Sequence, residues 1–498
     1  MKKILLYLPL VILGTLVCSC DDYLDVNENP NQVSVDQLNA SLMMPAVEMN
    51  LATSYGNYLR IVGGFLSQHF CQSFGTSNYL DYSKFQVSAT RCSGVYSDMY
   101  QRVLGNLRTI MDKSEASEDW GTYLAATTLR AFALQTLVDC FGEVPYTEML
   151  DVSNNAPKYD DGKTIYEGVI AEIDAALAKA SASDLVCTNF LFPSEKAGAW
   201  IQFANALKLK MYMRMAAVMD VKDKVSALVD EGNFPESDVA FVGCWADKSG
   251  EMSPYFAEEF SPNWGSNQIN VVANLAIIGT MQTSSYTDPR LAAFFEENES
   301  GNYVGGLSGT NFPNTKNFKS AYWCRPKASY DMPVNLITVS ETEFFLAEYY
   351  ARYGSADKAK EHYNAAVEAS FASAGVDGAD GYIAQNPYKQ DEYAKCIGIA
   401  KWVALAGTND FEAWCEVRRL NYPAFGNVKG SDLYNLQDDA TFKPELYTPG
   451  TLYTPIDYFG EVGVNKLLER LPYPESSTTR NANSPEFLGY TKPVFWGE

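Results

Sequence analysis

Residues 411–425 read FEAWCEVRRLNYPAF, and this stretch does most to decide the fold. Apolar residues recur through its first part with the spacing of one helix face, which predicts a helix. Arg418 and Arg419 lie near the C-terminal end of that helix, where positive charges interact favourably with the helix dipole. Pro423 then prevents the helix from continuing. We therefore expect a helix that ends just before the proline.

Two other stretches carry similar stop signals. Residues 137–150 read LVDCFGEVPYTEML, where Gly142 can adopt the left-handed conformation that ends a helix and Pro145 prevents its continuation. Residues 470–487 read RLPYPESSTTRNANSPEF, where Pro472 and Pro474 favour an extended backbone. We interpret these residues as positions that define the fold, not as ligand contacts.

Between these stretches, long amphipathic patterns predict further helices. A capping box formed by Thr164 and Glu167 is expected to begin one of them. Because the helices contain small residues and arrive in pairs, they favour helix-hairpin repeats of the tetratricopeptide type, although the consensus of those repeats is absent. The predicted fold class is mainly α. The helical patterns cover residues 120–138, 164–180, 200–218, 344–353, 359–370 and 397–405.

Long segments without helical periodicity separate these groups, mainly residues 233–340 and 421–498. They are rich in Gly, Pro, Asn and Ser, but also in aromatic residues, which disordered segments usually lack. We therefore expect them to be ordered and to carry the functional site. No shift in composition marks a linker, so residues 36–498 are predicted to form a single domain.

Composition excludes several functions. The 498 residues include 38 Lys+Arg and 61 Asp+Glu, and the net charge of −23 argues against binding to nucleic acid. The two histidines, His69 and His362, are too few for a multi-histidine zinc site or a two-histidine hydrolytic site. Aromatic residues make up 13% of the chain, which requires an explanation.

The N-terminus is typical of an exported lipoprotein. Residues 1–19 resemble a signal peptide, because two lysines precede an apolar stretch too short to span a bilayer. Val17-Cys18-Ser19-Cys20 resembles a bacterial lipobox, which implies lipid on Cys20 and a tether over residues 20–35. An ordinary secretory signal is the alternative. Asp21-Asp22 resembles an acidic surface-export signal, so we expect a lipid-anchored protein on the outer face of the outer membrane.

Four stretches together resemble the SusD/RagB family of nutrient-binding outer-membrane lipoproteins, in its SusD-like branch. They are CDDYLDVNENPNQ at residues 20–32 and, further along the chain, the three stretches quoted above at residues 137–150, 411–425 and 470–487. The resemblance implies a mainly helical fold, with four tetratricopeptide-like helix pairs and irregular segments that carry the ligand site. It also implies a protein without enzymatic activity that binds glycans or other nutrients and covers a SusC-like TonB-dependent transporter.

Sugar binding needs flat aromatic rings together with polar groups that bond hydroxyls. Three segments bring both kinds of residue together: residues 74–96, 255–264 and 302–330. No family motif identifies the contacts, and the alternative is that each aromatic residue packs against the scaffold. The predicted ligand contacts are Trp264, Trp323, Tyr322 and Tyr82, with Asn263, Asp81 and Arg325 as polar partners.

No cofactor is expected. Asp25, Asn27, Asn29 and Asp36 have part of the spacing of a calcium loop, but Pro30 stands where that loop needs glycine. A turn is the favoured interpretation, while calcium bound elsewhere by the many acids stays open. The eight cysteines after Cys20 form no CxxC pair, which favours buried free thiols.

Three alternatives to a glycan-binding lipoprotein remain at this stage. A secreted glycoside hydrolase needs only two suitably spaced carboxylates, although helix pairs do not make a catalytic barrel. A repeat scaffold that binds only proteins would present a flat face instead of an aromatic pocket. A third alternative is a member of the same family that binds peptides.

Overall fold

The computed structural model describes residues 39–73, 75–151, 153–261, 270–310, 322–434 and 442–497. The predicted signal peptide, Cys20, the calcium-like stretch, Asn263 and Trp264 therefore lie outside the described residues. The long helices are α2 (Ala40–Thr53), α5 (Ala89–Asp98), α6 (Gly105–Ala116), α7 (Trp120–Phe141), α8 (Gly162–Leu177), α9 (Ala197–Met215), α10 (Lys222–Glu231), α14 (Val339–Tyr353), α15 (Ala356–Ala374), α17 (Tyr393–Leu405) and α18 (Asp410–Leu420).

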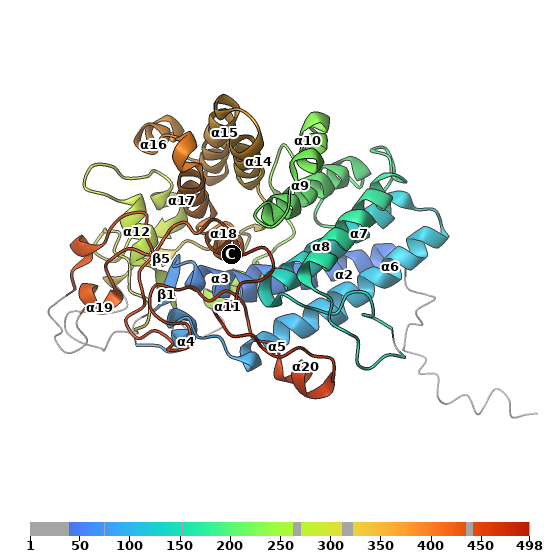
Figure 1. Ribbon diagram of the computed structural model, residues 1–498, viewed down its shortest axis with the longest axis horizontal. Coiled ribbons are helices and arrows are strands. Elements are labelled where there is room, and N and C mark those ends of the chain that lie inside the picture. Colours follow the sequence, from blue (N-terminus) through green and yellow to red (C-terminus); the bar gives the residue numbers. More distant parts are fainter. Residues whose placement is uncertain are drawn as a thin grey trace, which may run out of the picture.

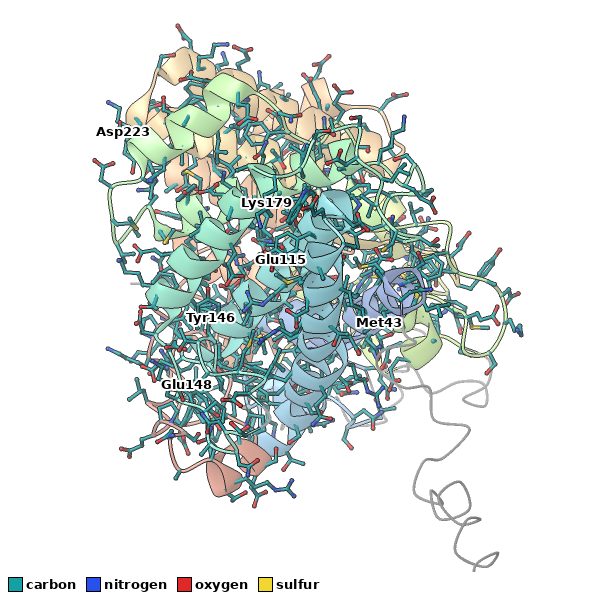
Figure 2. All side chains as sticks on the ribbon, turned by 90° about the vertical axis from the view of Figure 1, so that its right-hand side faces the viewer. Met43, Glu115, Tyr146, Glu148, Lys179 and Asp223 are labelled. Carbon is teal, nitrogen blue, oxygen red and sulfur yellow. The ribbon has the colours of Figure 1, made fainter. Side chains whose placement is uncertain are left out.

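These helices pack largely as sequential neighbours, as the paired patterns predicted. Helix α6 contacts α7, α7 contacts α8, α14 contacts α15 and α17 contacts α18. In Figure 1 the long helices form an arc along the top and right of the molecule. Figure 2 turns the right side toward the viewer, where Glu115 on α6 and Lys179 just after α8 lie together, with 3.1 Å between Nζ and Oε1. The prediction of a mainly α fold is confirmed.

The predicted start of one helix is wrong. Helix α8 begins at Gly162, and its cap is Asp161, whose side chain accepts hydrogen bonds from the backbone N–H of Thr164 at 3.0 Å and from its hydroxyl at 2.6 Å. The aspartate three positions earlier thus takes the capping role, because its carboxylate can accept the free N–H groups of the first turn. A capping box does occur at α14, between Thr338 and Glu341.

The described parts of the segments between the long helices contain short elements. Within these parts, three antiparallel strand pairs join residues that are far apart in the chain: β1 with β3, β2 with β6, and β4 with β5. Figure 1 shows several of these elements on the left, next to α12 and α19. The strands are β1 (Phe70–Gln72), β2 (Val239–Phe241), β3 (Val271–Ala273), β4 (Phe295–Glu296), β5 (Arg325–Pro326) and β6 (Val334–Ile337). The remaining helices and turns are η2 (Ser54–Leu59), α3 (Arg60–Leu66), α4 (Leu80–Ser83), η3 (Met99–Leu104), α11 (Pro254–Glu259), α12 (Leu275–Met281), α13 (Leu291–Phe294), α16 (Ala379–Gln385), η6 (Gln390–Glu392), α19 (Gly430–Leu433), η7 (Pro444–Leu446) and α20 (Glu475–Arg480).

Helix α18 lies at the centre of the molecule, in close contact with α3. A Cβ atom added to Gly63 of α3 would lie 2.4 Å from the Cα of Phe411, so only glycine allows this crossing. Asp410, the first residue of α18, forms a buried ion pair with Arg60 at 3.2 Å, and its Oδ1 atom lies within hydrogen-bond distance of Nδ1 of His69, at 2.8 Å. The two helices are therefore held together by close backbone approach and by charge.

The two arginines lie in the last turn of α18, as predicted, and have a further role there. Both are buried. Arg418 donates to the backbone oxygens of Asp139 at 3.0 Å and Glu469 at 2.6 Å, and Arg419 pairs with Glu348 and Glu416. Besides interacting with the helix dipole, each arginine thus satisfies buried acceptors from other segments.

A larger set of buried charges connects α18 to α7, α9 and α14. Arg214 on α9 pairs with Asp139 on α7 and with Glu412 on α18, and all three side chains are fully buried. Lys210, one turn earlier on α9, lies 2.6 Å from Glu412. We call these residues, with Glu341, Glu348, Glu416, Lys401 and Arg419, the central ion network. All eight described cysteines are free thiols, as predicted, and five of them are buried.

Candidate ligand-binding groove

Two adjoining cavities form an open groove on the described surface. Their volumes are about 870 and 310 Å³, and both are lined by Asn57 and Glu258. We call the combined site the η2 groove, because the turn η2 forms its floor. Its aromatic lining residues are Phe190 and Trp245 in the larger cavity and Tyr58, Tyr79 and Tyr82 in the smaller one.

The floor of the groove is a π-helical turn between α2 and α3. The three elements form one continuous helix, because Thr53, Ser54 and Arg60 all keep right-handed helical backbone angles. A π-helical turn widens a helix locally and changes the direction of its side chains. Here Asn57 and Tyr58 line the cavities, and the buried Oδ1 atom of Asn57 has no hydrogen-bond partner among the described residues. The floor therefore contains a polar atom whose hydrogen-bonding capacity the described residues leave unused.

One wall carries two large apolar rings. Trp245 follows strand β2, and its Nε1 donates to the backbone oxygen of Phe241 at 3.2 Å, which orients the half-buried indole. Phe190 lies on the same cavity and is 36% exposed. An open indole beside a phenyl ring is the kind of surface on which the apolar face of a sugar can pack.

A buried carboxylate holds Phe190 in this position. Glu48 on α2 is 0% exposed and accepts hydrogen bonds from the backbone N–H groups of Phe190 at 2.6 Å and Leu191 at 3.4 Å. Burial raises the pKa of Glu48 to about 7, although the two N–H groups lower it in part. The position of one wall thus depends on a carboxyl group that titrates near neutral pH.

The wall of the smaller cavity is a stack of tyrosines and an arginine. The rings of Tyr79 and Tyr82 lie 5.6 Å apart and are nearly parallel, at 15°. Arg91 lies over Tyr82 at 5.0 Å and pairs with Asp81, with its Nε atom 3.0 Å from Oδ2. The hydroxyl of Tyr79 donates to Glu259, and burial raises the pKa of that carboxyl. These contacts fix the wall before any ligand is present.

The structure places the predicted contacts in two groups. Tyr82 belongs to the wall of the η2 groove, and Asp81 supports that wall through Arg91. Tyr82 is only 2% exposed, because Tyr79 and Arg91 cover its ring. Among the described residues the groove therefore contains this part of the predicted site, and a direct contact of either residue with ligand stays a prediction.

The second group lies near β5, outside the lining of the groove. Trp323 is 2% exposed and packs edge to face against Phe442, with 5.6 Å between ring centroids. Tyr322 is 37% exposed and packs against Trp323, while Arg325 pairs with Glu296 at 3.3 Å. Strand β5 contacts β3, which pairs with β1, and β1 contacts α4. Strand β5 is thus linked to α4 only through β3 and β1 in this series of contacts, and the ligand roles of these three residues stay predictions.

Sequence reasoning missed the residues that make the groove open. Trp245 lies in the aromatic-rich segment after residue 233, so its surroundings were recognised, but nothing distinguished it from neighbouring aromatic residues. Phe190 lies outside the three segments chosen as candidates. Asn57 sits in a helical pattern, where an asparagine gives no signal of a π-helical turn.

Helix pairs that carry an aromatic-lined groove between irregular segments define a scaffold of the SusD-like class. The chain belongs to the SusD-like family described as "Starch-binding associating with outer membrane", which matches residues 30–440. A comparison with curated proteins finds no significant match.

Solved structures agree with this assignment of the fold. A SusD homolog from Bacteroides uniformis has a TM-score of 0.71 and 22% identity, with 91% of this chain and 98% of that chain covered. A chitin-binding SusD homolog from Flavobacterium johnsoniae has a TM-score of 0.70 and 18% identity, with 90% and 98% covered. The scaffold is thus tetratricopeptide-like, as predicted. Through the described ranges, no helix combines the length and apolar character needed to cross a bilayer.

Proposed function

We propose that this protein is a cell-surface glycan-binding lipoprotein that captures oligosaccharides and delivers them to a SusC-like TonB-dependent transporter. One observation carries the glycan-binding part: the half-buried ring of Trp245 lines the same cavity as the exposed carboxylate of Glu258 and the side chain of Asn57. A sugar presents apolar C–H faces and hydroxyl donors, so it needs both kinds of surface within one site.

The groove supports binding without a chemical step. A glycan chain would stack on Trp245 and Phe190 and donate hydroxyl hydrogens to Asn57 and Glu258. The volume of the larger cavity, about 870 Å³, lies in the range of small-molecule sites. The family description names starch binding, and one structural neighbour is named a chitin-binding protein, which supports a glycan as the ligand.

The location and the partner rest on other observations. The lipobox-like sequence ending at Cys20 supports a lipid anchor, and the family description supports association with the outer membrane. A protein tethered there would concentrate oligomers at the entrance of a transporter. Trp264, Asn263, Tyr322, Trp323 and Arg325 are proposed as further contacts for a longer ligand.

The glycan-binding proposal is tested with a soluble Cys20→Ala protein and a panel of neutral polysaccharides in affinity gels. We expect at least one glycan to bind without being cleaved. In the same background, Trp245→Ala should weaken that binding about tenfold, because an aromatic platform contributes about 1–1.5 kcal/mol. Trp120→Ala is the matched control, since Trp120 packs against Lys179 and Tyr123, which do not line the groove.

Each contrary result has a clear meaning. Failure of every glycan to bind would contradict glycan binding, whereas release of sugar products would support the hydrolase. Equal affinity of the two tryptophan variants would move the binding site away from the η2 groove. Membrane retention of the Cys20→Ala protein in cells would contradict the lipid anchor.

A further inference from the structure

The cationic side chains around the η2 groove are already paired. Among the described lining residues, Arg91 is the one cation, and it pairs with Asp81 through two contacts of 3.0 and 3.2 Å. Its Nη2 atom also donates to the backbone oxygen of Asn78 at 2.6 Å. Lys248, beside the larger cavity, pairs with Glu251. An incoming anion would therefore have to displace an existing carboxylate to gain a positive partner.

The ring donors of the groove are also committed. Trp245 donates its Nε1–H to Phe241, and Tyr79 donates its hydroxyl to Glu259. These bonds hold the two walls in place, so breaking them would disturb the groove itself. A ligand group that only accepts hydrogen bonds therefore finds few strong donors here.

The lining also supplies two acceptors, Asn57 and Glu258. The Oδ1 atom of Asn57 is buried and has no partner within the described part of the chain. The side chain of Glu258 is exposed and lines both cavities, so its carboxylate lies between the two ends of the groove. The chain as a whole carries a net charge of −23, which lowers the local concentration of anions further.

We propose that the η2 groove selects neutral and amino-bearing glycans and rejects uronate or sulfate glycans, with Glu258 as the residue that sets this preference. The inference rests on the proposed glycan-binding function. A hydroxyl or an ammonium group can donate to Asn57 and Glu258. A carboxylate or sulfate brings a negative charge and only acceptors to a site whose strong donors are occupied, so its dehydration is not compensated.

The test uses three β-1,4-linked hexamers that share one backbone: the glucose hexamer, the glucosamine hexamer and the glucuronate hexamer. Binding to the soluble Cys20→Ala protein is measured by calorimetry at low salt. We expect the glucosamine hexamer to bind about two- to fivefold more tightly than the glucose hexamer, as for one exposed ion pair. The glucuronate hexamer should bind more weakly than both, and the glucosamine advantage should shrink in 0.5 M salt, because exposed charges are screened.

Variants of Glu258 separate charge from shape. Glu258→Gln should bring the ratio of the affinities for the glucosamine and glucose hexamers to about one, and it should also weaken binding of the glucose hexamer, because a neutral amide replaces a charged acceptor. Glu258→Lys should strengthen binding of the glucuronate hexamer. The control is Glu236→Gln, an exposed acid outside the groove lining, which should change no ratio. Thermal unfolding verifies that each variant is folded.

The outcomes distinguish this inference from the proposed function. Tighter or equal binding of the glucuronate hexamer, or an unchanged preference in Glu258→Gln, overturns the charge preference and leaves glycan binding intact. If none of the three hexamers binds but a polysaccharide of the panel does, the charge preference is also overturned and glycan binding still stands. If no glycan binds at all, both proposals are wrong.

Discussion

The Glu48→Gln variant should become increasingly more stable than the wild-type protein as the pH rises from about 4.5 to above 7. Burial raises the pKa of Glu48 from 4.5 to about 7, so the folded state binds this proton more tightly than the unfolded state. The stability that the proton provides is fully present below pH 4.5 and is lost as the pH passes through 7. Glutamine keeps the shape of the side chain and does not titrate.

The size of the effect follows from the shift. A change of about 2.5 pKa units corresponds to about 3 kcal/mol, because one unit equals about 1.4 kcal/mol. Only backbone N–H groups stabilise the Glu48 carboxylate. No charged partner therefore changes the direction of the pKa shift or of the stability change that follows from it. At pH 4 the variant and the wild type should have similar stability. At pH 8 the variant should be more stable by about 3 kcal/mol.

Urea unfolding of the soluble protein at pH 4, 6 and 8 measures this difference. The quantity compared is the midpoint shift between variant and wild type at an unchanged slope, because other titrating groups cancel in the difference. Glu236→Gln serves as an exposed control and should show a constant difference. If the Glu48→Gln difference varies by less than about 0.5 kcal/mol between pH 4 and 8, the reasoning about Glu48 is refuted.

Three further predictions concern anchoring and packing. Cys20→Ala should move the protein from the membrane fraction to the soluble fraction, and continued membrane association would contradict the lipobox interpretation. Gly63→Ala should lower the free energy of unfolding by about 3 kcal/mol, because its Cβ would overlap the backbone of α18. Gly94→Ala is the control, since a Cβ there meets nothing within 4 Å. If denaturant unfolding shows the same loss of stability in both variants, the close contact between α3 and α18 is not what requires glycine at position 63. Arg214→Met should lower the free energy of unfolding by about 3–5 kcal/mol, because it leaves buried carboxylates without a positive partner. The control Arg102→Met removes an exposed ion pair and should lower it by less than about 0.5 kcal/mol. Thermal melting measures both changes.

The helices were largely predictable because local rules determine them. The break between α14 and α15 falls at Gly354, where the apolar pattern pauses, and α18 ends just before Pro423. The start of α8 was misplaced, because two good capping residues, Asp161 and Thr164, stand within one turn of each other. Sequence alone does not decide between such competing caps.

The site was predictable only in part, because its members come from distant segments. Composition pointed to aromatic residues in the irregular segments, and Tyr82 does line the groove. Which aromatic residue stays open depends on packing between segments: Trp323 is covered by Phe442, whereas Trp245 is only half buried. The roles of Arg418 and Arg419 depend on acceptors hundreds of residues away or on other helices, which no local pattern reports.

The central ion network has a consequence for how the groove of this protein can change. Its charges pair in one alignment of α7, α9, α14 and α18, and a shifted alignment would leave buried ions without partners, at several kcal/mol each. The residues of this network are not among those that line the groove. A substitution of a side chain that faces the groove therefore leaves these pairs intact, so the surface offered to a ligand can change while the helical framework stays in register.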